Sequence, residues 1–117
     1  MISSIIDVAV VVSNGQEAAE WYRDKLGLNV GGEPEGHWVT VSPPGTEGQP
    51  YIHLCADFYD LEPGLTGIAF GTDDLDAAYE DMKAKGVEFT VEPTKEDWGT
   101  YARFTDPDGN EFWLMEE

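Results

Sequence analysis

Two side chains of this sequence could move a proton or hold a metal ion, and both lie in stretches typical of β-strands. Asp7 interrupts the aliphatic run 5–12, where a dry and unpaired carboxylate would be costly. His53 is the imidazole of the stretch YIHLC, and an imidazole serves as a metal ligand or a general base. If Asp7 orients His53, the pair can abstract a proton. Otherwise Asp7 is a solvated or ion-paired carboxylate and His53 is a hydrogen-bonded lining residue.

A second set of side chains could recognise a ligand by surface and shape. Trp38, Tyr101 and Trp113 offer large rigid rings, which either stack on a planar molecule or fill a closed core or a dimer seam. Arg103 is one of only six basic residues. It therefore either meets an acidic group of a ligand or neutralises Asp7 or Glu111.

The elements that position these side chains follow one pattern, written twice. The first half is typical of a strand, a helix and three short strands, over residues 5–12, 13–27, 28–32, 36–42 and 50–56. The second half repeats this order over residues 66–72, 73–86, 87–93, 99–105 and 110–116. Ser13 with Gln16 resembles a capping box before the first helix, and Gly27 and Gly86 stop the two helices.

This repetition predicts a tandem duplication of a βαβββ module within one α+β domain. Module one covers residues 1–57, a joint covers 58–65 and module two covers 66–117. Two such modules can face each other across a pseudo-twofold axis and leave a trough between curved sheets. Strand alternation then turns one side of each strand toward a helix and the other toward the trough. The expected ligand-binding side chains are Trp38, Thr40, Tyr51, Tyr101, Arg103, Trp113 and Met115, with Asp7, His53 and Glu111 as further polar points.

The paired modules, the stretch AEWYRDKLGL and the ending FTDPDGNEFWLME together resemble the vicinal oxygen chelate superfamily. This superfamily includes glyoxalase I, extradiol dioxygenases, fosfomycin-modifying enzymes and the bleomycin resistance proteins. The resemblance covers nearly the whole chain and implies a curved mixed-sheet cavity. Relatives of the bleomycin resistance type are homodimers, so the resemblance also implies a homodimer here.

Metal enzymes of the superfamily draw their ligands from the first and fourth strands of each module. Carried over, these positions are Asp7, His53, Gly67 and Trp113. Glycine and indole bind no metal, so two ligands remain where a catalytic zinc or non-haem iron site needs about three. Glu111 or Cys55 could supply the third, since each lies two residues from one of these positions on the same strand face.

Gly67 and Trp113 replace two of the four metal ligands, and Trp38, Tyr101 and Trp113 offer large aromatic surfaces. These features favour a metal-independent, cofactor-free protein of the glyoxalase/bleomycin resistance type that binds a planar or amphipathic small molecule. The alternative is a lyase or dioxygenase with a divalent ion (Fe, Mn, Ni or Zn) on Asp7, His53 and Glu111. A metal-free lyase or isomerase with His53 as base and Asp7 beside it, or a dimeric interaction module without a ligand, are further hypotheses.

The composition limits the kinds of binding partner and the cellular compartment that we expect for this protein. The 117 residues suffice for one domain, and 24 acidic against six basic residues give a net charge of −18. That charge argues strongly against nucleic acid and anionic membranes as partners, and it indicates either a protein from a salt-rich cytoplasm or a merely acidic mesophile protein. The single cysteine permits no internal disulfide and fits a reducing compartment. The N-terminal apolar run is short and lacks a basic start, so a cytoplasmic location is expected.

Overall fold

The structure, a computed structural model, describes residues 1–33, 38–46, 50–56 and 61–117. The chain divides into two compact units, Met1–Pro63 and Gly64–Glu117. Each unit is one βαβββ module, which confirms the predicted α+β fold of two tandem modules. The predicted joint, 58–65, includes residues 58–60, which lie outside the described residues. The module boundaries and the trough between the sheets stay predictions.

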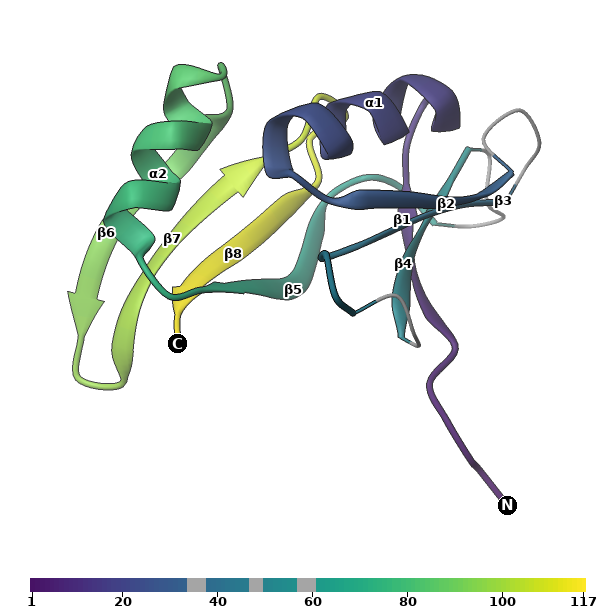
Figure 1. The fold of residues 1–117 in the computed structure, drawn as a ribbon, viewed down its shortest axis with the longest axis horizontal. Helices are drawn as coiled ribbons and strands as arrows, with labels where there is room; N and C mark the ends of the chain where they lie inside the picture. Colours follow the sequence, from purple (N-terminus) through teal and green to yellow (C-terminus); the bar gives the residue numbers. More distant parts are fainter. Residues whose placement is uncertain (34–37, 47–49, 57–60) are drawn as a thin grey trace. The chain divides into compact units, whose positions relative to one another are not determined.

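The first unit is a four-stranded mixed sheet with one helix on one face (Figure 1). Its elements are β1 Asp7–Val11, α1 Gly15–Leu26, β2 Asn29–Glu33, β3 Trp38–Ser42 and β4 Tyr51–Cys55. The strand order is β1-β4-β3-β2, with β1 parallel to β4 and the other pairs antiparallel. Because α1 packs on β2, β3 and β4, the side chain of Val8 on the edge strand β1 stays 39% exposed.

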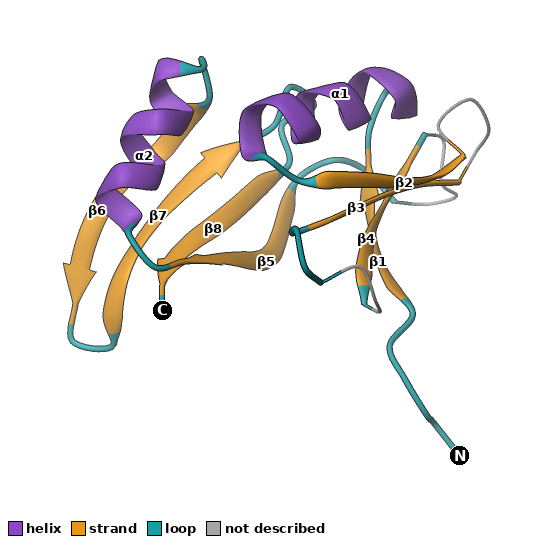
Figure 2. Ribbon diagram, viewed as in Figure 1, coloured by secondary structure: helices purple, strands orange, loops and turns teal. Residues whose placement is uncertain are grey.

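The second unit has the same connectivity (Figure 2). Its elements are β5 Leu65–Thr72, α2 Leu75–Ala84, β6 Glu88–Glu96, β7 Gly99–Thr105 and β8 Glu111–Glu116. The strand order is β5-β8-β7-β6, again with one parallel pair, β5 with β8. Helix α2 packs on β6, β7 and β8. The order of strands therefore repeats the duplication that the sequence predicts.

Local capping explains where the helices begin and end. The side chain of Asn14 accepts a hydrogen bond from the backbone N–H of Glu17 at 3.0 Å, so Asn14 and not Ser13 caps α1, and the predicted capping box is wrong. Asp74 caps α2 in the same way through Ala77. Gly27 ends α1 in a left-handed conformation with φ 71°, which glycine adopts without a Cβ penalty.

In each unit the side of the sheet that faces the helix forms the core. Val39, Val41 and Leu54 are buried under α1, and Phe104 and Phe112 under α2. Alternation leaves the opposite side, here called the helix-free face, to the other residues of the same strands. The predicted facing of the strands is therefore confirmed within each unit, and the candidate site residues lie on the two helix-free faces.

The acidic surface has a testable consequence for stability. Three ion pairs form among the described residues, so most of the 24 carboxylates repel one another. Raising NaCl from about 0.1 M to 1 M shortens the screening length from about 10 Å to 3 Å. We expect the unfolding free energy to rise by on the order of 1 kcal/mol, about 4 °C in Tm. Urea unfolding at each salt concentration measures this; a gain seen in sulfate but absent in both NaCl and KCl would contradict screening.

Candidate functional site

The helix-free face of the second unit is aromatic. Ala102, Phe104, Phe112 and Leu114 are buried toward α2, which leaves the alternate residues of β7 and β8 on the other face. These half-buried residues are Tyr101, Arg103, Glu111, Trp113 and Met115. Strand pairing sets Arg103 opposite Trp113 and Tyr101 opposite Met115. The structure thus brings together all five site residues that the sequence predicts for this module.

The rings on this face form a continuous stack. Trp98, in the turn between β6 and β7, is 57% exposed and lies parallel to Tyr101, with ring centroids 5.1 Å apart at 28°. Tyr101 in turn lies on Trp113 at 4.8 Å and 32°. The Cζ atom of Arg103 lies 4.7 Å from the Trp113 ring centroid, within cation–π range. One face of the exposed Trp98 ring is covered by Tyr101.

Arg103 is also paired with a carboxylate. Its Nη2 lies 2.7 Å from Oε1 of Glu111, and the two side chains are 30% and 15% exposed. The contact is an ion pair without regular hydrogen-bond geometry, and Nε of Arg103 has no hydrogen-bond partner within the described residues. Of the alternatives for Arg103, the structure therefore shows a cation that neutralises a carboxylate of its own module. That pairing engages the carboxylate named as a third metal ligand.

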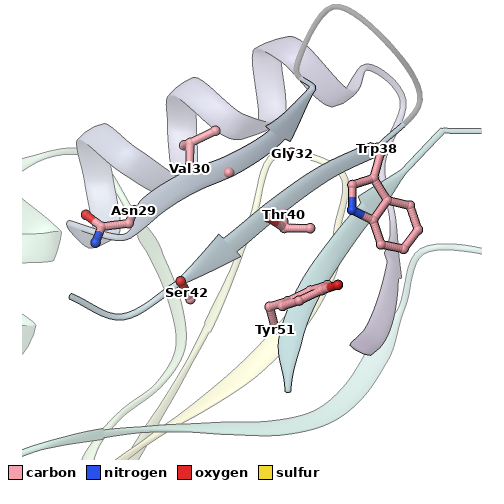
Figure 3. Close-up of a pocket in the computed structure, with 8 residues that line it drawn as sticks. Asn29, Val30, Gly32, Trp38, Thr40, Ser42 and Tyr51 are labelled. Atoms are coloured by element: carbon pink, nitrogen blue, oxygen red, sulfur yellow. The ribbon is translucent and has the colours of Figure 1, made fainter. Parts of the chain in front are cut away.

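The helix-free face of the first unit is a groove of about 300 Å³ (Figure 3). It is lined by Asn29, Val30, Gly31, Gly32, Trp38, Thr40, Ser42 and Tyr51. The ring centroids of Trp38 and His53 lie 4.2 Å apart. The Trp38 ring also meets the Tyr51 ring edge-on, with ring centroids 6.3 Å apart and an interplanar angle of 90°. His53 is buried, 7% exposed. The predicted lining residues Trp38, Thr40 and Tyr51 thus lie along one groove.

Five lining residues of this groove escaped the sequence analysis: Asn29, Val30, Gly31, Gly32 and Ser42. Asn29 pairs with Ser42 and Gly31 pairs with Thr40, so Asn29, Gly31 and Ser42 lie on the same face as the predicted residues. The signal was the pair of glycines in β2, a strand too poor in side chains to fill its own face.

The duplication extends to the register of the site. Thr40 pairs with His53 in the first unit, and Arg103 pairs with Trp113 in the second. Trp38 covers His53 just as Tyr101 covers Trp113. In both modules the fourth-strand position that supplies a metal ligand in family enzymes is thus covered by a ring from the neighbouring strand.

Asp7 and His53 are offset along their strands. Asp7 pairs with Tyr51, and the residue that pairs with His53 is Ala9. Two residues along a strand are about 7 Å, so the register does not set the carboxylate directly beside the imidazole. Roles for Asp7 and His53 as acid–base pair or metal ligands stay predictions.

The donor set does not fit a catalytic metal ion. Gly67 and Trp113 occupy the two positions of the second unit at which metal enzymes of the superfamily carry ligands, and neither side chain supplies a donor atom. Among the described residues, no group of three or more His, Cys, Asp or Glu side chains is arranged to hold an ion. Burial raises the pKa of the Cys55 thiol, and the charge of Asp7 raises it further, so that thiol is protonated and a poor ligand.

Gly67 also has a backbone role. The pairing of β5 with β8 shifts between Leu65 and Ala69, and within this bulge Gly67 has a φ of 71°. The Thr66 hydroxyl accepts from the Ile68 N–H at 3.1 Å and donates to the Glu111 carbonyl at 2.7 Å. A side chain here, including a histidine that restored a ligand, would strain the backbone.

Gly67→Ala is expected to lower the unfolding free energy by about 1–2 kcal/mol, because an L-residue is strained in the left-handed region. Gly64→Ala is the matched control: no atom lies within 4 Å of an added Cβ at either position, but Gly64 lacks the positive φ. Urea unfolding measures both variants. Equal losses would show that the bulge conformation is not the reason for the glycine.

Comparisons with known proteins decide the family. A profile of the Glyoxalase/Bleomycin resistance protein/Dioxygenase superfamily matches residues 4–114. The chain belongs to this superfamily. The predicted resemblance is thereby confirmed, since this superfamily joins the same glyoxalases, dioxygenases and resistance proteins. The equivalent strand positions of the two modules can accordingly be compared with those of other glyoxalase/bleomycin resistance members.

Several relatives match this glyoxalase/bleomycin resistance chain over nearly its full length. The uncharacterized protein YetH of Bacillus subtilis (strain 168) is 38% identical over 120 residues, which cover 99% of this chain and 100% of that protein. A superfamily member from Sphaerobacter thermophilus DSM 20745 has a TM-score of 0.88 and 35% identity, over 100% and 99% of the two chains. TnmS3, an antibiotic binding protein from Streptomyces sp. CB03234, has a TM-score of 0.85 and 31% identity, over 98% and 96%.

The relatives therefore share the whole fold of this glyoxalase/bleomycin resistance protein.

No helix in the described ranges is long and apolar enough to cross a membrane.

Proposed function

We propose that this protein binds a small planar or amphipathic molecule on its aromatic helix-free faces, without a bound metal ion. The observation that carries the proposal is the stack of Trp98, Tyr101 and Trp113. Its outermost ring, Trp98, is 57% exposed, so a flat ligand can extend the stack. Rigid aromatic side chains bind such a molecule with little loss of conformational entropy.

A structural relative supports the binding of a small molecule. TnmS3 is an antibiotic binding protein, and it shares 31% identity with this chain over 98% of its length. Because the net charge of the chain is −18, an anionic ligand would be repelled at long range. We therefore expect a neutral or cationic planar molecule.

The metal-dependent alternative has weaker support. A lyase or dioxygenase would need Asp7, His53 and Glu111 as ligands, and Glu111 is already paired with Arg103 at 2.7 Å. Releasing that carboxylate would leave Arg103 half-buried without its counter-charge, which costs free energy. The ion pair therefore favours ligand binding without a metal.

Calorimetric titration with a panel of planar aromatic compounds, before and after dialysis against a chelator, tests the proposal. We expect at least one compound to bind with the same affinity in both preparations. Binding that disappears on dialysis and returns with a divalent ion would favour the alternative. A stoichiometric metal ion that is lost in His53→Ala would do the same.

A homodimer is the expected assembly. The N-terminal segment before β1 carries exposed apolar side chains, with Ile2 97%, Ile5 67% and Ile6 54% exposed, which a second copy could cover. Sedimentation equilibrium measures the mass directly, and a monomer at all concentrations would contradict this expectation.

A further inference from the structure

The groove of the first unit differs chemically from the aromatic face of the second. Its described lining consists of hydroxyl, amide, aromatic and glycine residues and the aliphatic Val30, with no formally charged side chain among them. In a chain with 24 acidic residues, the uncharged side chains of the described lining residues distinguish this groove from the acidic surface. Neutral groups that both donate and accept hydrogen bonds suit a neutral ligand with several hydroxyl groups.

The Thr40 hydroxyl is the polar group at the centre of the groove. Figure 3 shows Thr40 on β3 between Trp38 and Ser42, with Tyr51 alongside on β4. Thr40 is only 9% exposed, and it lines the groove. A hydroxyl in this place can both donate a hydrogen bond to a ligand and accept one from it.

Gly31 keeps the space above this hydroxyl open. A Cβ atom at position 31 would lie 2.8 Å from Oγ1 of Thr40, closer than the two atoms can approach. Gly31 does not have the positive φ of its neighbour Gly32, so its backbone would accept an L-residue. The glycine at position 31 therefore serves space and not chain conformation.

Two aromatic rings line the groove. Trp38 and Tyr51 stand at 90° to each other, with centroids 6.3 Å apart, and Trp38 is 42% exposed. Ring faces contact the C–H surface of a saturated ring, and the hydroxyls of Thr40 and Ser42 lie beside them to bond its polar edge. The volume of about 300 Å³ is at the lower end of small-molecule pockets and suits one such ring.

We propose that this groove binds a neutral polyhydroxylated ring, such as the sugar of a glycosylated aromatic compound. The proposal rests on the proposed function, because a glycosylated aromatic compound belongs to the amphipathic ligands proposed there. Thr40 is the central hydrogen-bonding residue, and Gly31 is the residue that admits the ring.

Umbelliferyl glucoside, galactoside and xyloside, compared with free umbelliferone, separate the hydroxylated part from the planar part. We expect at least one glycoside to bind about tenfold more tightly than umbelliferone, since a site that bonds hydroxyls rejects ligands lacking them. The amide resonances of Gly31, Thr40 and Ser42 should shift with that glycoside in NMR spectra, and shift less with umbelliferone.

Gly31→Ala should remove this tenfold preference, because the methyl group occupies the space above Thr40. Thr40→Val keeps the shape of the side chain and should lower glycoside affinity severalfold with umbelliferone affinity unchanged. Gly64→Ala, whose added methyl meets no atom within 4 Å, should leave both affinities unchanged. Thr40→Val decides the question if Gly31→Ala does not fold.

Each result supports or overturns the proposal. Glycosides that bind no better than umbelliferone, or a preference that survives both Gly31→Ala and Thr40→Val, would overturn it and leave the proposed function intact. Failure of the glycosides, umbelliferone and the planar panel to bind would count against both proposals.

Discussion

Trp113→Ala is expected to weaken the binding of a planar ligand by about 1–3 kcal/mol, a loss of about 5- to 150-fold in affinity. The indole contacts Tyr101 at 4.8 Å and Arg103 at 4.7 Å, so its removal takes away the support of the whole stack. Isothermal titration calorimetry is the suitable measurement, because four tryptophans make the fluorescence signal composite.

Trp21→Ala is the matched control for that experiment. Trp21 lies on α1, on the helix side of the first unit, with Tyr22 as its ring neighbour at 5.1 Å. Its removal should change ligand affinity by less than twofold, although it also deletes an indole. If Trp113→Ala and Trp21→Ala lower affinity equally while both variants keep their native circular dichroism, the aromatic face is not the binding surface.

Asn110→Ala is expected to lower the unfolding free energy by about 2–4 kcal/mol, because it breaks a buried polar network. Asn110 is 2% exposed. Its Oδ1 accepts from the Gly64 N–H at 3.1 Å, and its Nδ2 donates to Oδ2 of Asp106 at 2.8 Å. Without the amide, Oδ2 of the buried Asp106 carboxylate and the backbone N–H of Gly64 each lose a hydrogen bond.

Asn14→Ala provides the comparison, since Asn14 is an exposed helix cap whose loss costs about 1 kcal/mol. Urea unfolding of both variants at one salt concentration measures the difference. An Asn110→Ala variant that loses no more stability than Asn14→Ala would show that the turn tolerates the loss of its amide. If the folded fraction of the Asn110→Ala variant binds the ligand with unchanged affinity, the substitution affects stability alone.

The fold could be predicted because its signals are local. Helix stops such as Gly27 and the alternation of β7 and β8 depend on residues a few positions apart. The repeated order of elements then reveals two modules, and the duplication predicts equivalent positions in each. Which side chains share a face of a strand therefore followed from spacing, as for Trp38, Thr40 and Tyr51, which line one groove of the first unit.

Other features depend on pairing between distant strands, and no local pattern encodes them. The sequence left Asp7 and Glu111 as possible partners of Arg103, and only the register of β7 with β8 places Arg103 near Glu111. The bulge at Gly67 is a property of two strands more than 40 residues apart, since it arises where β5 meets β8. A glycine in the sequence does not say whether it serves conformation, as at position 67, or space, as at position 31. That distinction requires the backbone angles and the neighbouring atoms of the folded chain.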